Sequence, residues 1–152
     1  MTIPSLEPRI TLEVKRTYPA SCDQVFRAWT EAHALERWFK PMGSSTKVTQ
    51  LELCVGGAFR FDLTHPDKST SFMSGYYVEI LRPEKLVFTW QSGATNNEET
   101  LVTVSLTERA AFTEVRLTHA RLQDENMLLL HQNGWESCMD TLNELYQRGV
   151  TT

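Results

Sequence analysis

The stretch DENMLLLHQNGWESCMDTLNELYQR, residues 124–148, predicts one long amphipathic helix. Asp124 is a residue type that caps helix N-termini, and Gly149 is one that ends helices. The apolar side of the helix repeats at alternating spacings of three and four, which is typical of a helix with one buried stripe. The stripe consists of Leu128, His131, Trp135, Cys138, Leu142 and Leu145. A helix of about 24 residues spans about 36 Å, so it can cover one face of a whole sheet.

The residues before this helix form short runs in which apolar and polar side chains alternate, and this pattern predicts antiparallel strands. The predicted strands are residues 10–18, 47–53, 58–63, 72–81, 85–91, 99–106 and 112–119. Gly56 and Gly57 predict a turn or bulge between two of them. Since the strands alternate, one face of the sheet is expected to be buried, and only the C-terminal helix is long enough to cover it.

Two short helices are predicted between the first two strands. Ser21 followed by Gln24 has the form of a capping box, which opens the first helix. Thr30 is expected to cap the second helix, and Pro41 to end it. Strands beside clustered helices predict an α+β fold: a curved sheet of six to seven strands around the long helix, with the two short helices at one end. We expect a single domain over residues 1–152, with its core at about 10–148.

Composition excludes several classes of protein. The 152 residues carry 15 basic and 19 acidic side chains, a net charge of −4, which argues against nucleic-acid binding and against a polybasic membrane module. No apolar run reaches the roughly 20 residues that cross a bilayer, and residues 1–9 have no signal-peptide pattern, so we expect a cytoplasmic protein without a membrane partner. Cys22, Cys54 and Cys138 lack metal or disulfide spacing and are expected to be free thiols.

Several segments of the sequence resemble one known family. They are RTYPA (16–20), VFRAWT (25–30), LERWFKP (35–41), GGAFRF (56–61), GYYVEI (75–80), PEKLVFTW (83–90) and GW (134–135). In this order they resemble the homologues of the activator of heat-shock-protein-90 ATPase. The resemblance covers roughly residues 10–148.

This resemblance implies the helix-grip fold of the START-related (SRPBCC, Bet v-like) superfamily. The superfamily includes polyketide cyclases, plant hormone receptors and lipid carriers, and its members bind many apolar ligands. It does not imply a single activity, because only some branches perform chemistry.

The sequence predicts no metal site and no cofactor. The four histidines, His33, His65, His119 and His131, have no spacing typical of a zinc site. Phosphate-binding glycine motifs and the serine nucleophile motif are absent from the sequence. Cys138 lies on the apolar stripe, where a cysteine is most often a small core residue. The catalytic residues therefore stay unknown, and we favour a protein that is not an enzyme.

Two polar residues on predicted inner faces leave alternatives open. His131 is interpreted first as a satisfied core or rim histidine, and alternatively as a hydrogen-bonding group that faces a ligand. Glu79 is expected to point outward; if it pointed inward, it would be a buried carboxylate with a raised pKa and a candidate acid or base.

Aromatic residues give the strongest functional signal, because apolar walls with few polar groups are typical of small-molecule sites. The predicted ligand-binding residues are Trp29, Trp38, Phe59, Tyr77, Trp90, His131 and Trp135. Gly134 costs its helix about 1 kcal/mol relative to alanine. We attribute its presence to close approach of the sheet or of a ligand.

These observations favour a binding domain for a small hydrophobic molecule whose identity the sequence does not give. Two alternatives stay open: a protein-interaction module that regulates a chaperone ATPase, and a cyclase-like or hydrolase-like enzyme that uses His131 or Glu79 as acid or base. A homodimer through the sheet edges is also expected to be feasible.

Overall fold

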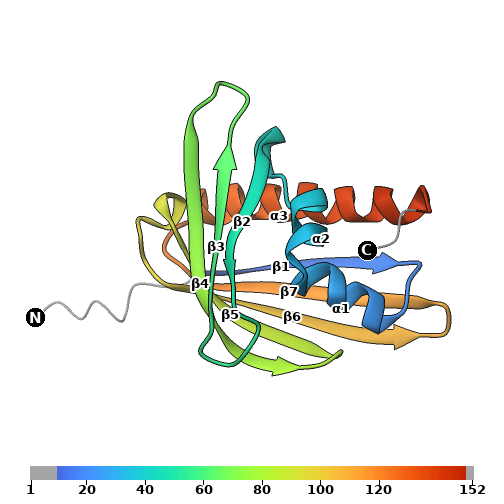
Figure 1. Ribbon diagram of the computed structural model, residues 1–152. Coiled ribbons are helices and arrows are strands. Elements are labelled where there is room, and N and C mark those ends of the chain that lie inside the picture. Colours follow the sequence, from blue (N-terminus) through green and yellow to red (C-terminus); the bar gives the residue numbers. More distant parts are fainter. Residues whose placement is uncertain (1–9, 150–152) are drawn as a thin grey trace, which may run out of the picture.

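The computed structural model describes residues 10–149 and shows a seven-stranded antiparallel sheet curved around one long helix (Figure 1). The strands lie in the order β1-β7-β6-β5-β4-β3-β2. Their bounds are β1 (Ile10–Tyr18), β2 (Ser45–Leu51), β3 (Ala58–Thr64), β4 (Thr70–Leu81), β5 (Lys85–Ser92), β6 (Thr100–Arg109) and β7 (Phe112–Leu122). The helices are α1 (Cys22–Thr30), α2 (Ala32–Trp38) and α3 (Glu125–Gln147), with short 3-10 turns η2 (Pro41–Gly43) and η3 (Gly93–Thr95). The predicted helix-grip fold class is confirmed.

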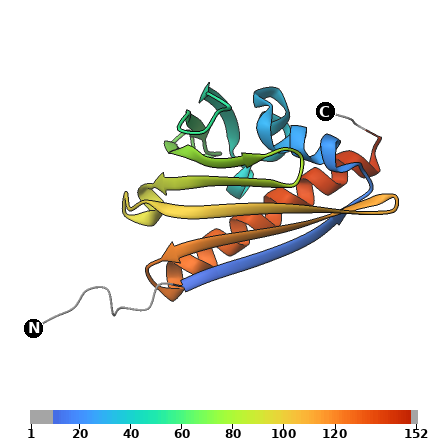
Figure 2. The same cartoon turned by 90° about the horizontal axis from the view of Figure 1, so that it is seen from below.

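Helix α3 crosses the concave side of the sheet, and α1 and α2 lie at one end of it (Figures 1 and 2). The hydroxyl of Tyr18 donates a hydrogen bond of 3.0 Å to the carbonyl oxygen of Met139, which joins edge strand β1 to α3. The buried side of α3 consists of Met127, His131, Trp135, Cys138, Met139 and Leu142. Two predicted stripe residues, Leu128 and Leu145, are only half-buried.

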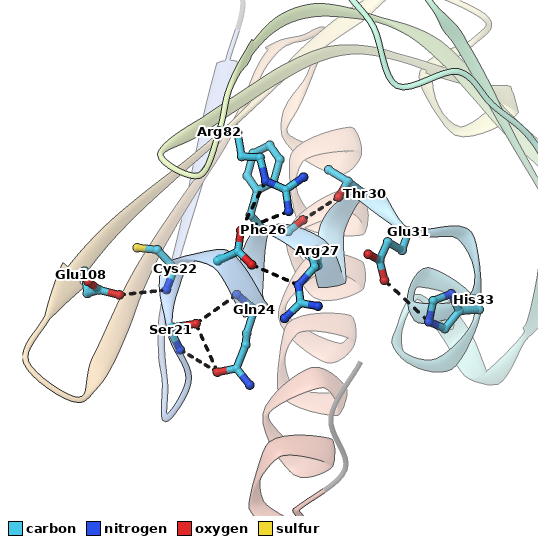
Figure 3. A network of polar contacts seen from close by, with 11 residues as sticks. Ser21, Cys22, Gln24, Phe26, Arg27, Thr30, Glu31, His33, Arg82 and Glu108 are labelled. Atoms are coloured by element: carbon cyan, nitrogen blue, oxygen red, sulfur yellow. Dashed lines mark hydrogen bonds and ion pairs between the residues drawn. The ribbon is translucent and has the colours of Figure 1, made fainter.

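The start of α1 follows the prediction, and the start of α2 does not. The Ser21 side chain accepts from the Gln24 backbone while the Gln24 side chain accepts from the Ser21 backbone, so the capping box is present (Figure 3). The prediction that Thr30 caps α2 is wrong. Thr30 is the last residue of α1, where its hydroxyl donates to the carbonyl oxygen of Phe26 (2.9 Å), and Glu31 precedes α2 without a side-chain cap. Serine and threonine hydroxyls commonly bond back to the preceding turn in this way.

Polar contacts fix α1 to the adjacent end of the sheet (Figure 3). Asp23 pairs with Arg27 of its own helix (3.2 Å) and with Arg82 after β4 (3.1 Å). The carboxylate of Glu108 accepts a hydrogen bond of 3.1 Å from the backbone N–H of Cys22. Because the ion pairs are about half exposed to water, their main effect is to orient α1 rather than to stabilise the fold.

A dense aromatic core fills the space beneath α1 and α2. The indole rings of Trp29 and Trp38 lie 4.6 Å apart between centroids, and Trp29 stacks on Trp135 of α3 at 5.9 Å. The indole N–H of Trp38 donates to the carbonyl oxygen of Ala28 (2.8 Å), which ties α2 to α1. The void left in this part of the core is about 20 Å³, which is about the size of one water molecule.

Candidate functional site

An open groove of about 630 Å³ lies between α3 and the concave side of the sheet, beyond the aromatic core. Volumes of this size are typical of small-molecule sites. The helix contributes Leu130, His131, Asn133, Gly134, Trp135 and Ser137 to its wall. The opposite wall comes from the hairpin between β3 and β4, from η2 and from the end of β5 with η3: Phe39, Pro41, Met42, Leu63, His65, Ser71, Phe72, Met73, Trp90, Ser92, Gly93 and Ala94.

Large apolar side chains of the groove wall are exposed to solvent. Met42 on η2 is 64% exposed and Leu130 on α3 is 47% exposed. Both also line the groove. Apolar side chains gathered at a concave site are a mark of binding rather than of packing alone.

The inner end of the groove is closed by the rings of Phe39, Trp90 and Trp135, which also line the small void in the core. Trp90 and Trp135 lie 5.1 Å apart between ring centroids, and Phe39 lies 5.7 Å from each of them. These rings separate the filled half of the space beneath α3 from the open half. The concavity is therefore solid at the end near α1 and α2 and hollow at the other.

The seven predicted ligand-binding residues divide between these two halves. Trp90, His131 and Trp135 line the open groove. The other four surround the small void in the packed core: Trp29, Trp38, Phe59 and Tyr77. Direct contact with a guest in the groove stays a prediction for the first three, while the other four lie behind them.

The groove also accounts for the space beside Gly134. A Cβ atom added at this position would meet no atom within 4 Å. Close approach of the sheet is therefore not the reason for this glycine, and that part of the prediction is wrong. The glycine leaves a section of the groove wall without a side chain, which is consistent with the alternative that a ligand approaches the helix here.

His131 is buried like a core histidine and also lines the open groove. Its side chain is buried, and its Nδ1 lies 2.8 Å from the carbonyl oxygen of Met127. Since a carbonyl only accepts, Nδ1 carries the proton and Nε2 is a free acceptor in the neutral ring. Among residues 10–149, Nε2 has no hydrogen-bond partner, and it is not sealed from solvent. Burial lowers the pKa of His131, which keeps the ring neutral at pH 7.

His119 on β7 forms a buried hydrogen-bond chain that the sequence analysis did not identify. The indole N–H of Trp135 donates to Nδ1 of His119 (3.0 Å), so Nε2 carries the ring proton and donates to the Thr100 hydroxyl (2.7 Å). Thr100 in turn donates to the carbonyl oxygen of Trp90 (2.6 Å). Burial, and to a smaller extent the neighbouring His131, lowers the pKa of His119 to about 3. The chain fixes the indole of Trp135 and the backbone of Trp90 at the inner end of the groove.

A sequence signal for His119 existed. It alternates with Val115 and Leu117 along β7, and all three are buried on the inner face. What the sequence could not supply was the partner on α3, since Trp135 reaches His119 only once the helix lies in the sheet.

No group of three histidine, cysteine, aspartate or glutamate side chains within residues 10–149 is arranged to hold a metal ion. Histidines 119 and 131 do lie side by side, with ring centroids 5.0 Å apart. However, both Nδ1 atoms and one Nε2 atom are already hydrogen-bonded, so the pair has only a single free lone pair.

Comparison with known proteins places the chain in a family. The model of the family described as Activator of Hsp90 ATPase homolog 1-like protein matches residues 19–147. The chain belongs to this family. The sequence comparison with curated proteins gives no significant match.

Solved structures resemble this family member closely in fold. A protein from Chromobacterium violaceum is similar with a TM-score of 0.80 and 22% identity, over 89% of this chain and 95% of the other. The AHSA1 protein from Silicibacter pomeroyi has a TM-score of 0.80 and 20% identity, over 91% and 99% of the two chains. CalU16 from Micromonospora echinospora has a TM-score of 0.67 and 26% identity, over 87% and 73%.

The remaining catalytic candidates of this family member lie outside the groove. A register shift between Tyr77 and Glu79 lets Tyr77 point into the core while Glu79 is exposed and pairs with Lys85 (3.3 Å). The expectation that Glu79 points outward is confirmed. Cys138 is buried, and burial raises the pKa of its thiol to about 12, so it is a small core residue rather than a thiolate. None of the described helices is both long enough and apolar enough to cross a membrane.

Proposed function

We propose that this chain binds a small, mostly apolar molecule in the groove beneath α3. The observation that carries the proposal is an open volume of about 630 Å³ with exposed apolar side chains at Met42 and Leu130. Membership of a helix-grip family supports a binding role in general terms but names no ligand.

Burial of apolar surface is sufficient to hold such a guest. Each 100 Å² of apolar surface removed from water stabilises a complex by about 2.5 kcal/mol before the costs of association. The rings that close the inner end of the groove are held by their neighbours, so little side-chain entropy is lost on binding. We expect Trp90, His131 and Trp135 to contact the guest, and Trp29, Trp38, Phe59 and Tyr77 to support them from behind.

A larger side chain at position 134 would occupy part of the groove, and this change tests the proposal. We expect the neutral fluorophore N-phenyl-1-naphthylamine to bind the wild-type protein at one saturable site. The variant Gly134→Leu places a side chain in the open groove, where even a Cβ meets no atom within 4 Å, and should weaken binding at least about tenfold. Fluorescence titration measures the dissociation constants of the wild type and of the variant.

The matched control is Asn126→Leu, which adds the same side chain to an exposed position of the same helix. It should leave the dissociation constant unchanged. Absence of saturable binding to the wild-type protein, or equal binding by Gly134→Leu, would contradict the proposal. Native mass spectrometry of the purified protein would then show whether a copurified molecule already occupies the groove.

We place this function in the cytoplasm, which the free thiols of Cys22, Cys54 and Cys138 support. The alternatives of a chaperone-ATPase regulator and of an enzyme stay predictions, as does a homodimer. The family description names an ATPase activator, but the groove supplies a more specific observation for ligand binding.

A further inference from the structure

We infer that the guest of the groove is an uncharged molecule that donates a hydrogen bond to Nε2 of His131. The class consists of phenols, alcohols and similar molecules with an apolar body and one N–H or O–H group. This inference rests on the proposed function and specifies the chemistry of its ligand.

Charged side chains are absent from the described part of the groove wall. None of the described residues that line the groove is an aspartate, glutamate, lysine or arginine. The guanidinium of Arg60 lies over the ring of Phe72 (4.0 Å), but it is already paired with Asp62 at 3.0 Å. A charged guest would lose its hydration without gaining a counter-charge, which is strongly unfavourable in an apolar site.

The hydrogen bond to Met127 fixes the tautomer of His131. Its Nδ1 donates to the carbonyl oxygen of Met127, so Nε2 can only accept. The adjacent His119 cannot supply the missing proton, because its two ring nitrogens are bonded to Trp135 and Thr100. Since Nε2 has no partner among the described residues and is open to solvent, a donor group on the guest can take the place of water there.

The polar groups near His131 do not change this assignment. His119 faces it from β7 and is held neutral by burial. His65, at the mouth of the groove, is hydrogen-bonded to the hydroxyl of Ser71 (2.8 Å). The hydroxyl of Ser92 accepts from the backbone N–H of Ala94 (3.1 Å). Hydroxyl groups can both donate and accept, whereas Nε2 of His131 can serve only a donor.

Three naphthalenes with the same apolar body test the inference: 2-naphthol, 2-methoxynaphthalene and naphthalene-2-sulfonate. At pH 7.5 the first is neutral with a donor, the second neutral without one, and the third an anion. We expect 2-naphthol to bind about three- to tenfold more tightly than the methyl ether, which corresponds to one net hydrogen bond. The sulfonate should bind at least about tenfold more weakly than the ether. Isothermal titration calorimetry measures all three.

The variant His131→Phe keeps an aromatic ring and removes the acceptor. It should lose the preference for 2-naphthol over 2-methoxynaphthalene. Gln132→Ala, which changes a polar residue beside His131 on the same helix but outside the groove wall, should keep the preference. If His131→Phe does not fold, the ¹⁵N shift of Nε2 in the wild-type protein gives the same information, because it should move on addition of 2-naphthol and not of the ether.

The outcomes separate the two proposals. Binding of neither neutral probe would overturn the proposed function itself. Equal binding of 2-naphthol and its methyl ether, or tight binding of the sulfonate, would overturn the inference about ligand class while the groove remained a binding site.

Discussion

The direction of the hydrogen bonds around His119 leaves this residue no place for a second proton. A proton added to Nδ1 would face the indole N–H of Trp135, which is itself a donor and lies 3.0 Å away. The ring is fully buried, so water cannot replace the lost interaction. A charged His119 is therefore incompatible with the folded arrangement at the inner end of the groove.

The stability of the fold should consequently depend on pH. The pKa of His119 is lowered from 6.5 to about 3 in the folded protein, so below pH 6.5 the unfolded chain takes up a proton that the folded chain does not. Stability is then lost as the pH falls from about 6.5 to about 3, at up to about 1.4 kcal/mol per pH unit. Urea unfolding at pH 7.5, 6.5 and 5 measures this loss.

The variant His119→Gln isolates the contribution of that residue. It should be less stable at pH 7.5 by about 1–3 kcal/mol, because at least one buried partner loses its hydrogen bond. Between pH 6.5 and 5 it should lose about 2 kcal/mol less stability than the wild type. Parallel curves for the two proteins would show that His119 is not held neutral by the fold.

At the scale of the element, the N-terminal half of α3 forms a wall of the groove. The hydrogen bonds of its first turn therefore affect the site. The side chain of Asp124 accepts a hydrogen bond of 2.8 Å from the backbone N–H of Met127. The carbonyl of this same Met127 holds Nδ1 of His131. The cap therefore stabilises the turn that fixes the tautomer of His131.

Removing the cap should destabilise the protein measurably. Asp124→Ala is expected to lower the free energy of unfolding by about 1 kcal/mol. Asp124→Asn retains an acceptor oxygen and should keep most of the stability. Urea unfolding of the two variants beside the wild type makes the comparison, and equal losses in both would indicate that the charge of Asp124, rather than its hydrogen bond, is what matters.

At the scale of the whole molecule, the sequence was sufficient for the fold because hydrophobic patterning and turn chemistry agree with it. The period of the α3 stripe and the capping box at Ser21 both appear in the structure. Thr30 shows the limit of such reasoning, because a threonine hydroxyl can cap a following helix or bond back to the preceding turn, and in the structure it bonds to the carbonyl of Phe26.

The site was only partly predictable, for a physical reason. Aromatic composition indicated an apolar interior but could not say which rings fill it and which border an open space. That division depends on how deeply α3 lies in the sheet, which places Trp135 against Trp90 and leaves Gly134 beside the groove. No sequence pattern indicated that Met42 and Leu130 are exposed at the groove, since neither belongs to the apolar stripe of a predicted helix.

The two halves of the space beneath α3 should also differ in dynamics. Amide groups around Cys138 and Leu142, where the helix is buried, are expected to exchange with solvent more slowly than those from Leu129 to Gly134 beside the groove. Hydrogen–deuterium exchange with mass spectrometry resolves these peptides. A bound naphthol should slow exchange in the second set and leave the first unchanged; uniform exchange along the helix would contradict this division.

The aromatic rings of Phe39, Trp90 and Trp135 close one end of the groove, and the space behind them is filled. These rings block passage of a bound molecule through that end, so entry and exit would both use the open side of the groove. A substitution there that affects only the transition state would alter the rates of binding and release together and leave the equilibrium unchanged. Such an architecture suits storing or handing over one molecule at a time, rather than passing a stream of molecules across the protein.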